Sequence, residues 1–419
     1  MYGNSPVESC EIAMSPRSED RTRAGTPGFQ AARLTQAREA RGLNTLLSLA
    51  GLLGVNTSTV SRWEDGTSSP SPDMLEKLAA LLRVRPAFFL RSGDDSKGAV
   101  FFRSLAAARK RDRARQLARL EWVRDITEVV AHYIALPRVD VPDLLACADW
   151  RTLRDEDIEG LATELRRHWR LGLGPIANVL TPIEKAGIIV ACDEMGTTNL
   201  DGLCRWSTAD GRPYVLLATD KMNFFRRQMD AAHEMAHAVL HRGVDAAALA
   251  AEFDLVERQA FRLASAFLMP SETFSLAVAQ PSMSRFRVLK DTWRVSIKAM
   301  IRRCQDLEIL DRDEATQLYK YYSARGWSKG EPGDDAVAVA KPRLLAQALG
   351  MIIDEGLRTK EDLLASDFTL AAGDVEDLCG LTPGWFEIAT GDVVSLQLRP
   401  REKAGQSDPG VVVPFGRKS

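Results

Sequence analysis

Apolar residues between positions 28 and 92 recur at intervals of three and four, the spacing expected of helices with one buried face. Gly42 and Gly54 stand where the first two helices would end, and Thr45 can cap the second. The predicted helices are Ala31–Arg41, Leu46–Leu53, the segment after Asn56 as far as Trp63, and Pro72–Leu82.

The second and third predicted helices have the packing pattern of a helix-turn-helix. Their apolar and small residues fall where two short helices that cross at a steep angle must touch. These residues are Leu49, Ala50, Leu53, Val55, Val60 and Trp63, with Gly54 in the turn. A generic helical hairpin is the alternative, but it does not require all seven positions at once. The pattern therefore favours a helix-turn-helix.

Three short apolar segments bounded by turn residues predict β-strands. They are Gly187–Cys192, Leu200–Trp206 and Pro213–Ala218. A helix without Gly or Pro follows over Asp230–His241, and another is predicted over Glu257–Met269, closed by Pro270. A small sheet followed by helices is an α+β order. An edge strand of such a sheet could bind a peptide by strand addition.

Helical patterns continue beyond this region, over Ser284–Ser323. Val295-Ser296, within Trp293–Leu310, looks like the turn of a second helix-turn-helix, for which packing is favoured over DNA contact. The expected fold is multidomain α+β. Its segments are a disordered tail (1–27), a helix-turn-helix domain (28–92), a basic helical linker (93–150), an α+β domain (151–283), a helix-turn-helix-like helical subdomain (284–332), a small helical C-terminal region (333–398) without an assigned role, and a second disordered tail (399–419).

The composition is that of a soluble globular protein. Of the 419 residues, 45% are hydrophobic and 27% are charged. Apolar runs stay below the roughly 18 residues of a membrane span, and the N-terminus has no apolar signal-peptide region. The six cysteines are far apart and form no CxxC pair, which argues against a disulfide framework or a thiolate zinc site. We expect a reduced, cytoplasmic protein with no membrane partner.

The formal net charge of −2 conceals a gradient along the chain. Residues 28–124 carry +8, whereas residues 125–419 carry −9. A basic module on an acidic remainder indicates contact with an anionic polymer such as DNA, although a solvated helix face has the same composition. The basic helix predicted over Arg103–Arg124 either adds salt-sensitive phosphate contacts or is a solvated linker.

Three of the five histidines lie within the Asp230–His241 helix. His233 and His237 are one turn apart on one face, so both imidazoles can reach one metal ion. Glu234 projects beside that face, where a carboxylate can hold a metal-bound water. This is the H-E-x-x-H arrangement of zinc peptidases, although three-letter matches also arise by chance.

A catalytic zinc site needs a third protein ligand and an open fourth position. His241 lies about 12 Å along the helix from His233, so it is predicted to pack or to orient the site. Glu257 is the preferred third ligand, with Glu252 and Asp254 as weaker alternatives. The donor that would stabilise the oxyanion is not identified; Tyr214, Tyr319, Tyr321 and Tyr322 are candidates.

The N-terminal segment resembles the helix-turn-helix of the Xre family, the lambda repressor and Cro type. The run Gly54–Glu64 and the segment Pro72–Phe89 carry the likeness. The resemblance implies double-stranded operator DNA as partner, a homodimer as a common state, and a third helix that enters the major groove. The implied DNA-reading residues are Asn56, Thr57, Ser58, Thr59, Ser61 and Arg62. Leu46 replaces the family's usual phosphate-binding Gln, which implies weaker backbone anchoring.

The chain from about Phe101 to Pro332 resembles the ImmA/IrrE-type metallopeptidases that follow an Xre domain. The likeness is carried by Phe101–Ser104, Trp169–Asn178, Arg212-Pro213, Asp230–His241, Glu257–Ala260, Phe267–Pro270, Gly326-Trp327 and Glu331-Pro332. It implies a zincin-like α+β peptidase of the gluzincin kind. His233, His237 and Glu257 then become the Zn²⁺ ligands, and Glu234 becomes the general base. Ala236 replaces a frequent Gly without endangering the metal site. Gly202 and Cys204 stand where the family often has Ala and Ser, which could alter the substrate cleft.

Together the two resemblances predict a DNA-binding regulator with a zinc endopeptidase. The family implies cleavage of a helix-turn-helix repressor, often in stress response; here the target would be a separate repressor, another copy or the chain's own linker. The alternative is a non-proteolytic Xre transcription factor whose peptidase-like domain senses a metal or ligand or serves dimerisation.

Overall fold

A computed structural model describes residues 25–93, 99–102, 110–145, 149–197, 200–220 and 223–387. The tail at 399–419, nearly all of the tail at 1–27, and the first residues of the Arg103–Arg124 helix lie outside this part of the chain. Among the described helices, none is long and apolar enough to cross a membrane.

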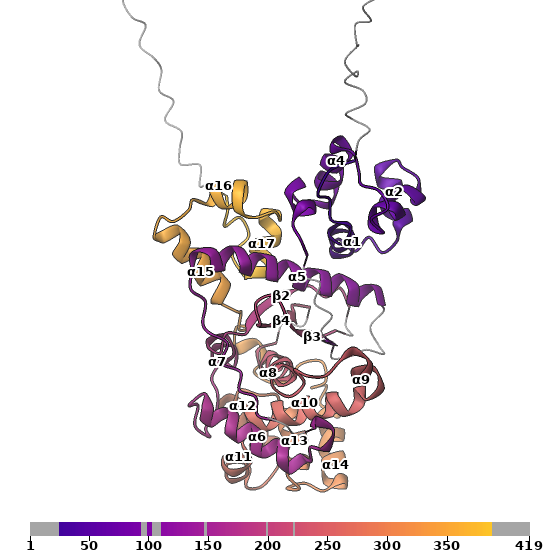
Figure 1. The fold of residues 1–419 in the computed structure, drawn as a ribbon. Helices are drawn as coiled ribbons and strands as arrows, with labels where there is room; N and C mark the ends of the chain where they lie inside the picture. The colour runs from indigo at the N-terminus through magenta and orange to yellow at the C-terminus, as the bar shows by residue number, and fades with distance from the viewer. Residues whose placement is uncertain are drawn as a thin grey trace, which may run out of the picture. The chain divides into compact units, whose positions relative to one another are not determined.

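The N-terminal domain has the predicted helices, to within one residue at each end. They are α1 (Ala31–Ala40), α2 (Leu46–Leu53), α3 (Thr57–Glu64) and α4 (Pro72–Leu82), followed by the 3-10 turn η1 (Pro86–Leu90) (Figure 1). The Thr45 side chain caps α2 by accepting from the backbone N–H of Ser48 at 3.1 Å. Gly54 ends α2 with φ of +67°, in the left-handed region that glycine adopts at least cost. Leu49 and Val60 are fully buried between the helices.

A mixed four-stranded sheet lies at the centre of the larger domain. Its order is β1 (Val100–Phe102), β3 (Gly202–Trp206), β4 (Pro213–Ala218) and β2 (Ile189–Asp193). β3 is antiparallel to both neighbours, and β2 is parallel to β4. Both faces are buried, since Cys204 and Val215 join one core cluster and Leu203 and Leu216 join the other. Burial on both sides explains the nearly continuous apolar runs of these strands.

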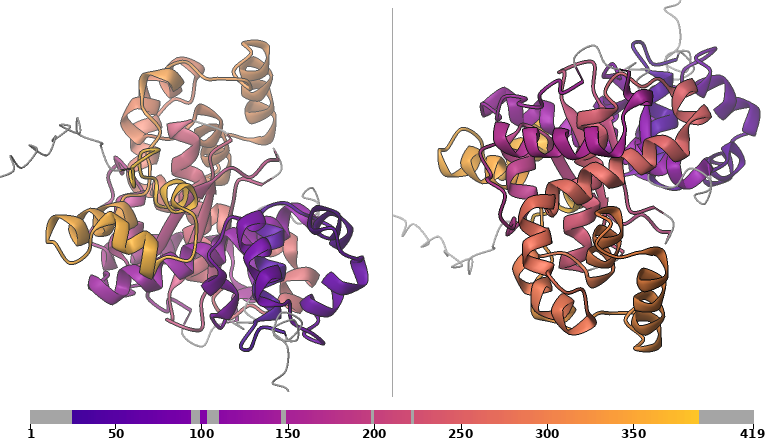
Figure 2. Two further views of the ribbon diagram at one scale, coloured as in Figure 1. Left: turned by 90° about the horizontal axis from the view of Figure 1, so that it is seen from above. Right: turned by 90° about the horizontal axis from the view of Figure 1, so that it is seen from below.

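The first face of the sheet is covered by α8 (Phe224–Leu240), which carries the histidine cluster. Behind α8 lies α10 (Phe253–Leu268), and α6 (Asp155–His168) packs on α10 (Figures 1 and 2). Because α10 begins at Phe253, Glu257 lies in its second turn and does not open the helix as predicted. The remaining elements of this side are η2 (Trp150–Thr152), α7 (Leu180–Lys185), α9 (Ala246–Ala251), α11 (Ser271–Val278), α12 (Met283–Trp293), α13 (Ile297–Asp306), α14 (Arg312–Ala324) and η3 (Asp334–Ala336).

The second face of the sheet is covered by α5 (Lys110–Tyr133), which also packs on α1. Arg119 of α5 is buried and binds Asp193 at the end of β2 (2.9 Å) and Asp374 (2.6 Å). The Arg119 guanidinium is therefore used in ion pairs within the chain and is not available for the phosphate contacts considered for this basic helix. Two C-terminal helices, α15 (Leu344–Asp354) and α17 (Ala372–Cys379), also contact α5 and β2. Between them lie α16 (Lys360–Asp362) and the π-helical turn η4 (Leu363–Asp367).

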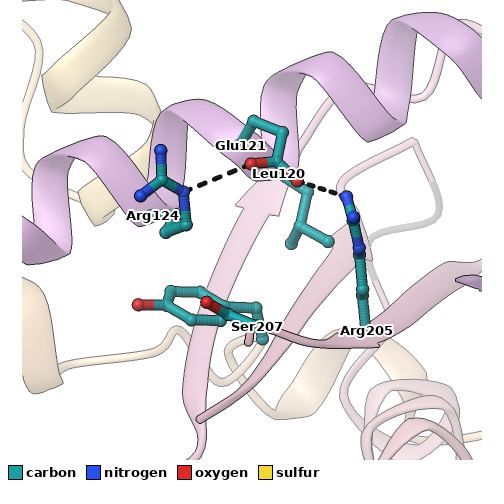
Figure 3. A pocket seen from close by; sticks show the side chains of 6 residues that line it. Leu120, Glu121, Arg124, Arg205 and Ser207 are labelled. Carbon is teal, nitrogen blue, oxygen red and sulfur yellow. Dashed lines mark hydrogen bonds and ion pairs between the residues drawn. The ribbon is translucent and has the colours of Figure 1, made fainter. Parts of the chain in front are cut away.

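A small cavity of about 10 Å³ lies between α5 and the sheet (Figure 3). Glu121 spans it by accepting hydrogen bonds from Arg124 (3.2 Å) and from Arg205 of β3. Its lining residues are Leu120, Glu121, Arg124, Arg205, Ser207 and Tyr214. A space of this size holds one water at most. The cavity therefore belongs to the packing of α5 and is no ligand site.

The helix-turn-helix-like pair α12 and α13 holds a carboxylate of its own chain. The backbone N–H groups of Ile297 and Lys298, in the first turn of α13, donate to Glu331 at 2.8 and 3.1 Å. Lys290 of α12 also binds this buried carboxylate, at 3.0 Å. In a DNA-binding pair, this end of the second helix faces the nucleic acid. Its occupation by Glu331 favours the packing role.

Candidate functional site

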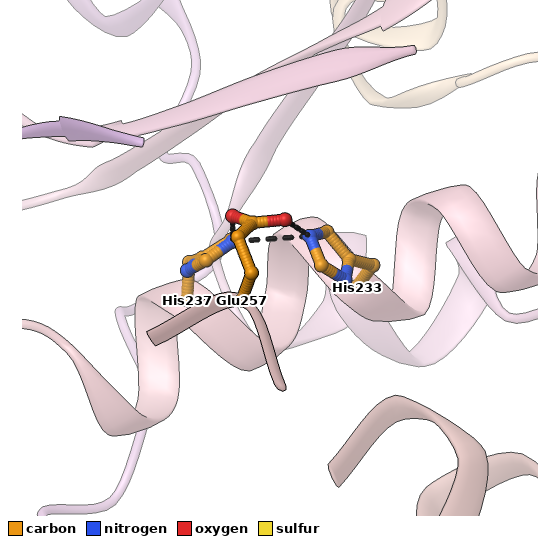
Figure 4. A group of neighbouring side chains, drawn as sticks. All are labelled: His233, His237 and Glu257. Atoms are coloured by element: carbon orange, nitrogen blue, oxygen red, sulfur yellow. Dashed lines mark hydrogen bonds and ion pairs between the residues drawn. The ribbon is translucent and has the colours of Figure 1, made fainter. Parts of the chain in front are cut away.

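Three side chains from two helices meet behind the sheet (Figure 4). The Nε2 atoms of His233 and His237 on α8 are 3.1 Å apart. Glu257 of α10 approaches them with its two carboxylate oxygens, at 3.3 Å from His233 and 3.2 Å from His237. Both imidazoles are fully buried, and the Glu257 side chain is 11% exposed. The structure thus brings together the three side chains that were predicted as metal ligands.

The spacing of these atoms suits a tetrahedral metal ion. Ligand atoms at 2.0–2.1 Å from a tetrahedral zinc are about 3.3 Å from one another. Two imidazoles and one carboxylate also form a donor set that zinc accepts, with one corner left for water or substrate. Burial alone would raise the pKa of Glu257, but the adjacent imidazoles of His233 and His237 lower it to about 2. The site therefore presents an anionic carboxylate to a cation.

Glu234 is fully buried and follows His233 on α8, under strand β3. Gly202 of β3 lies so close that an added Cβ would stand 2.7 Å from a Glu234 carboxylate oxygen. A Cβ atom does not approach an oxygen that closely, so any larger residue at position 202 would require the Glu234 carboxylate to move. Cys204, two residues further, is also buried near Glu234, and burial raises the pKa of its thiol. These two departures from the family's usual residues therefore lie beside the candidate base.

We expect the Gly202→Ala variant to displace Glu234 without removing the metal ligands. The new methyl group would push the flexible carboxylate, and misplacing a catalytic group by about 1 Å can cost about 100-fold in rate. Any turnover that depends on Glu234 should fall by roughly tenfold to 100-fold, while the metal content stays unchanged. Metal analysis beside a cleavage assay measures both. Wild-type turnover in Gly202→Ala would contradict the requirement for glycine.

His241 is not brought to the metal-ligand atoms, as its distance along the helix predicted. Its Nδ1 is 3.1 Å from Nδ1 of His237, and its Nε2 is 3.1 Å from the Gln259 side-chain oxygen. Burial and the neighbouring His237 lower the pKa of His241 to about 3. Sequence reasoning assigned no role to Gln259, because its position 18 residues from His241 matches no motif spacing.

Two aromatic rings lie against the imidazoles of His233 and His237. Phe101 of β1 stacks on His237 with centroids 4.9 Å apart and planes at 15°. Phe261 of α10 lies 4.3 Å from the ring of His233. Phe101 belongs to the segment Phe101–Ser104, which carries part of the family resemblance, yet strand β1 itself was not predicted. Three residues are too few for an alternating pattern.

Several of the alternative site residues have other partners or are exposed. Glu252 binds Arg151 at 2.6 Å, and Asp254 is exposed. Among the tyrosine candidates, Tyr214 packs on the α5 side of the sheet and donates to Asp210 at 2.6 Å. Tyr322 donates to Glu331 at 3.1 Å. Tyr319 and Tyr321 belong to α14, which packs on α13. The structure thus gives Tyr214 and Tyr322 partners away from the metal ligands.

The residues predicted to read DNA lie on α3 and at its N-terminus. Their side chains are exposed or half-buried, while Val60 and Trp63 face the core. The set comprises Asn56, Thr57, Ser58, Thr59, Ser61 and Arg62. Asn56 is the N-cap residue and its side chain makes no capping bond. The polar face of α3 is therefore available for an external ligand.

Two segments of the chain match known families. Residues 34–89 match the family described as helix-turn-helix. Residues 183–305, which include the strands β2 to β4 and the whole histidine and glutamate cluster, match the family described as IrrE N-terminal-like domain. No curated protein matches the chain. The protein combines an Xre-type helix-turn-helix DNA-binding domain with a peptidase domain of the ImmA/IrrE type.

Proposed function

We propose that this regulator is a zinc-dependent endopeptidase that acts in the cytoplasm and cleaves a helix-turn-helix repressor or its own chain. The observation that carries the proposal is the convergence of His233, His237 and Glu257 within 3.3 Å of one another, with Glu234 next to His233. A fused DNA-binding domain supports a role in gene control, because it would bring the peptidase to operator DNA where repressors reside.

In this proposal His233, His237 and Glu257 would hold the ion, and each residue has one task in hydrolysis. A bound zinc would lower the pKa of water to about 7 and polarise the scissile carbonyl. Glu234 would take the proton of the attacking water as its oxygen bonds to the carbonyl carbon. The same carboxylic acid would return the proton to the amine as the C–N bond breaks. Burial of both imidazoles strengthens these electrostatic interactions by excluding bulk water.

The proposal is tested by incubating the zinc-loaded full-length protein with purified helix-turn-helix repressors from the same genome. Mass spectrometry of the products identifies any scissile bond, in the repressor or in the chain itself. Cleavage that stops when a chelator removes the metal would support the endopeptidase. Stoichiometric zinc binding without cleavage of any repressor or of the chain would contradict it and favour the sensor or dimerisation alternative.

The DNA-binding part predicts that Arg62→Ala weakens and relaxes operator recognition. An arginine that binds a guanine edge through two hydrogen bonds contributes about 1–3 kcal/mol of discrimination. Fluorescence anisotropy with upstream DNA should therefore show a loss of about fivefold to 150-fold in affinity for the operator, and little change in affinity for unrelated DNA.

The matched control is Lys298→Ala, which removes an exposed cation from the first turn of α13. We expect no change in operator affinity, because Glu331 occupies the N-terminus of that helix. Equal losses in both variants would contradict the assignment of α3 as the reading helix.

A further inference from the structure

We propose that His241, Gln259 and the backbone carbonyl of Trp150 form a hydrogen-bond relay that fixes the tautomer of His237 and turns its Nε2 lone pair toward the metal. The inference rests on the proposed function only in that it takes a metal ion to be bound by His237. His241 and Gln259 are positioning residues, since each acts on the site through the next member of the relay.

The relay is continuous and buried. The Gln259 side-chain nitrogen donates to the Trp150 carbonyl oxygen at 2.7 Å. The Gln259 side-chain oxygen and His241 Nε2 are 3.1 Å apart, as are His241 Nδ1 and His237 Nδ1. His237 and His241 are fully buried, and Gln259 is 1% exposed. With so little exposure, these polar atoms depend on one another for hydrogen bonds.

The Trp150 carbonyl sets the direction of every bond in the relay. A carbonyl only accepts, so the Gln259 amide must turn its NH₂ toward Trp150 and its oxygen toward His241. That oxygen only accepts in turn, so His241 must carry its proton on Nε2. The Nδ1 of a neutral His241 is then an acceptor, and His237 must donate from Nδ1. A doubly protonated His241 would instead place a full charge in a buried position against a neutral amide, which is costly.

The end of the relay is the metal-facing atom. A neutral imidazole that carries its proton on Nδ1 has a free lone pair on Nε2. This is the His237 atom that lies 3.1 Å from His233 Nε2 and 3.2 Å from Glu257. Phe101 restrains the plane of the same ring by stacking on it. His237 is thereby held in the tautomer and orientation of a ligand before any metal arrives.

A direct readout is the nitrogen NMR spectrum of the metal-free full-length protein labelled on histidine. The chain has only five histidines, so individual assignment by substitution is practical. We expect His237 to be protonated on Nδ1 and His241 on Nε2. Protonation of His241 on Nδ1, or of His237 on Nε2, would overturn the relay.

The second readout is zinc affinity, measured by competition with a chelator. His241→Leu removes the acceptor for His237 and should weaken zinc binding by about 10-fold to 100-fold, the usual effect of losing such a partner. His241→Asn restores an acceptor near the Nδ1 position and should recover most of the affinity. Gln259→Leu leaves every ligand in place and should weaken binding in the same direction.

The matched control is Gln228→Leu. Gln228 is also a buried glutamine, on α8 itself, but its side chain bonds the backbone of Ile176 and Val179. It should change neither zinc affinity nor the His237 tautomer. Equal zinc losses in Gln259→Leu and Gln228→Leu would overturn the proposal, as would wild-type affinity in His241→Leu. A protein that shows the relay and cleaves nothing would refute only the proposed peptidase.

Discussion

Glu234→Gln is expected to lose proteolytic turnover by a factor of about 100 to 10,000, the contribution of a positioned general base. Glutamine preserves the shape of the side chain but cannot take a proton from water. The metal ligands are His233, His237 and Glu257 in our proposal, so zinc content should stay at the wild-type level. The measurement is a time course of repressor cleavage by equal amounts of zinc-loaded wild type and variant.

The companion variant Glu257→Gln separates the base from the ligand. It removes the negative charge that lies 3.2–3.3 Å from both imidazoles, so zinc affinity and turnover should fall together. Both substitutions replace a glutamate by glutamine, but only Glu257→Gln is expected to lower zinc binding. Cleavage by Glu234→Gln at the wild-type rate would mean that another group takes the proton, and the proposed mechanism would fail.

Local patterns predicted much of the framework. α2, α3 and α4, the three strands β2 to β4 and the histidine helix follow from spacing within short windows, because helix caps, turns and alternation are local properties. The pairing of His233 with His237 is equally local, since four residues make one helical turn. Glu257 was reached through its place in a second predicted helix and through family resemblance, and it now lies against both histidines.

Other features depend on contacts between residues that are far apart in the sequence. Gln259 matters because α10 packs across α8, and Gly202 because β3 lies over Glu234. Strand β1 is recognised only by its pairing with β3, through residue pairs such as Phe101 and Cys204. Each of these residues looks ordinary in the sequence, and its meaning comes from tertiary packing.

The C-terminal region, which had no assigned role, connects the DNA-binding domain with the peptidase sheet. The Arg85 backbone N–H, after α4, donates to the Thr369 carbonyl oxygen at 2.7 Å. Asp374 of α17 binds Arg41, the C-cap residue of α1, and Arg119 of α5, each at 2.6 Å. Since Arg119 also binds Asp193 of β2, one buried network links α1, α5, α17 and the sheet. We infer that this region fixes how the two domains are joined.

Asp374→Asn is therefore expected to destabilise the protein by about 3 kcal/mol at neutral pH. Removing one partner of a buried ion pair leaves uncompensated charge, at a usual cost of about 3–5 kcal/mol. The low end of this range is expected because Arg119 still pairs with Asp193 in the variant. Burial alone would raise the pKa of Asp374, but hydrogen bonds and charge from Arg41 and Arg119 hold it below its usual value. The stabilisation is thus complete above the ordinary aspartate pKa of about 4 and is lost as the pH falls through the lower folded value.

Urea unfolding at pH 7 and at pH values below 4 measures both parts of this prediction, and hydrogen exchange locates the effect. The difference in free energy of unfolding between the wild type and Asp374→Asn should narrow in acid. Protonation of Asp374 there removes from the wild type the ion pairs that the variant lacks at every pH. Amides of α1 and α17 should exchange faster in the variant.

Asp157→Asn is the control. The Asp157 carboxylate also has a lowered pKa, of about 2, but it pairs with Arg154 at the surface, where ion pairs contribute little. If the difference in free energy of unfolding between the wild type and Asp374→Asn stays constant with pH, the charge of the Asp374 carboxylate does not hold the domains together.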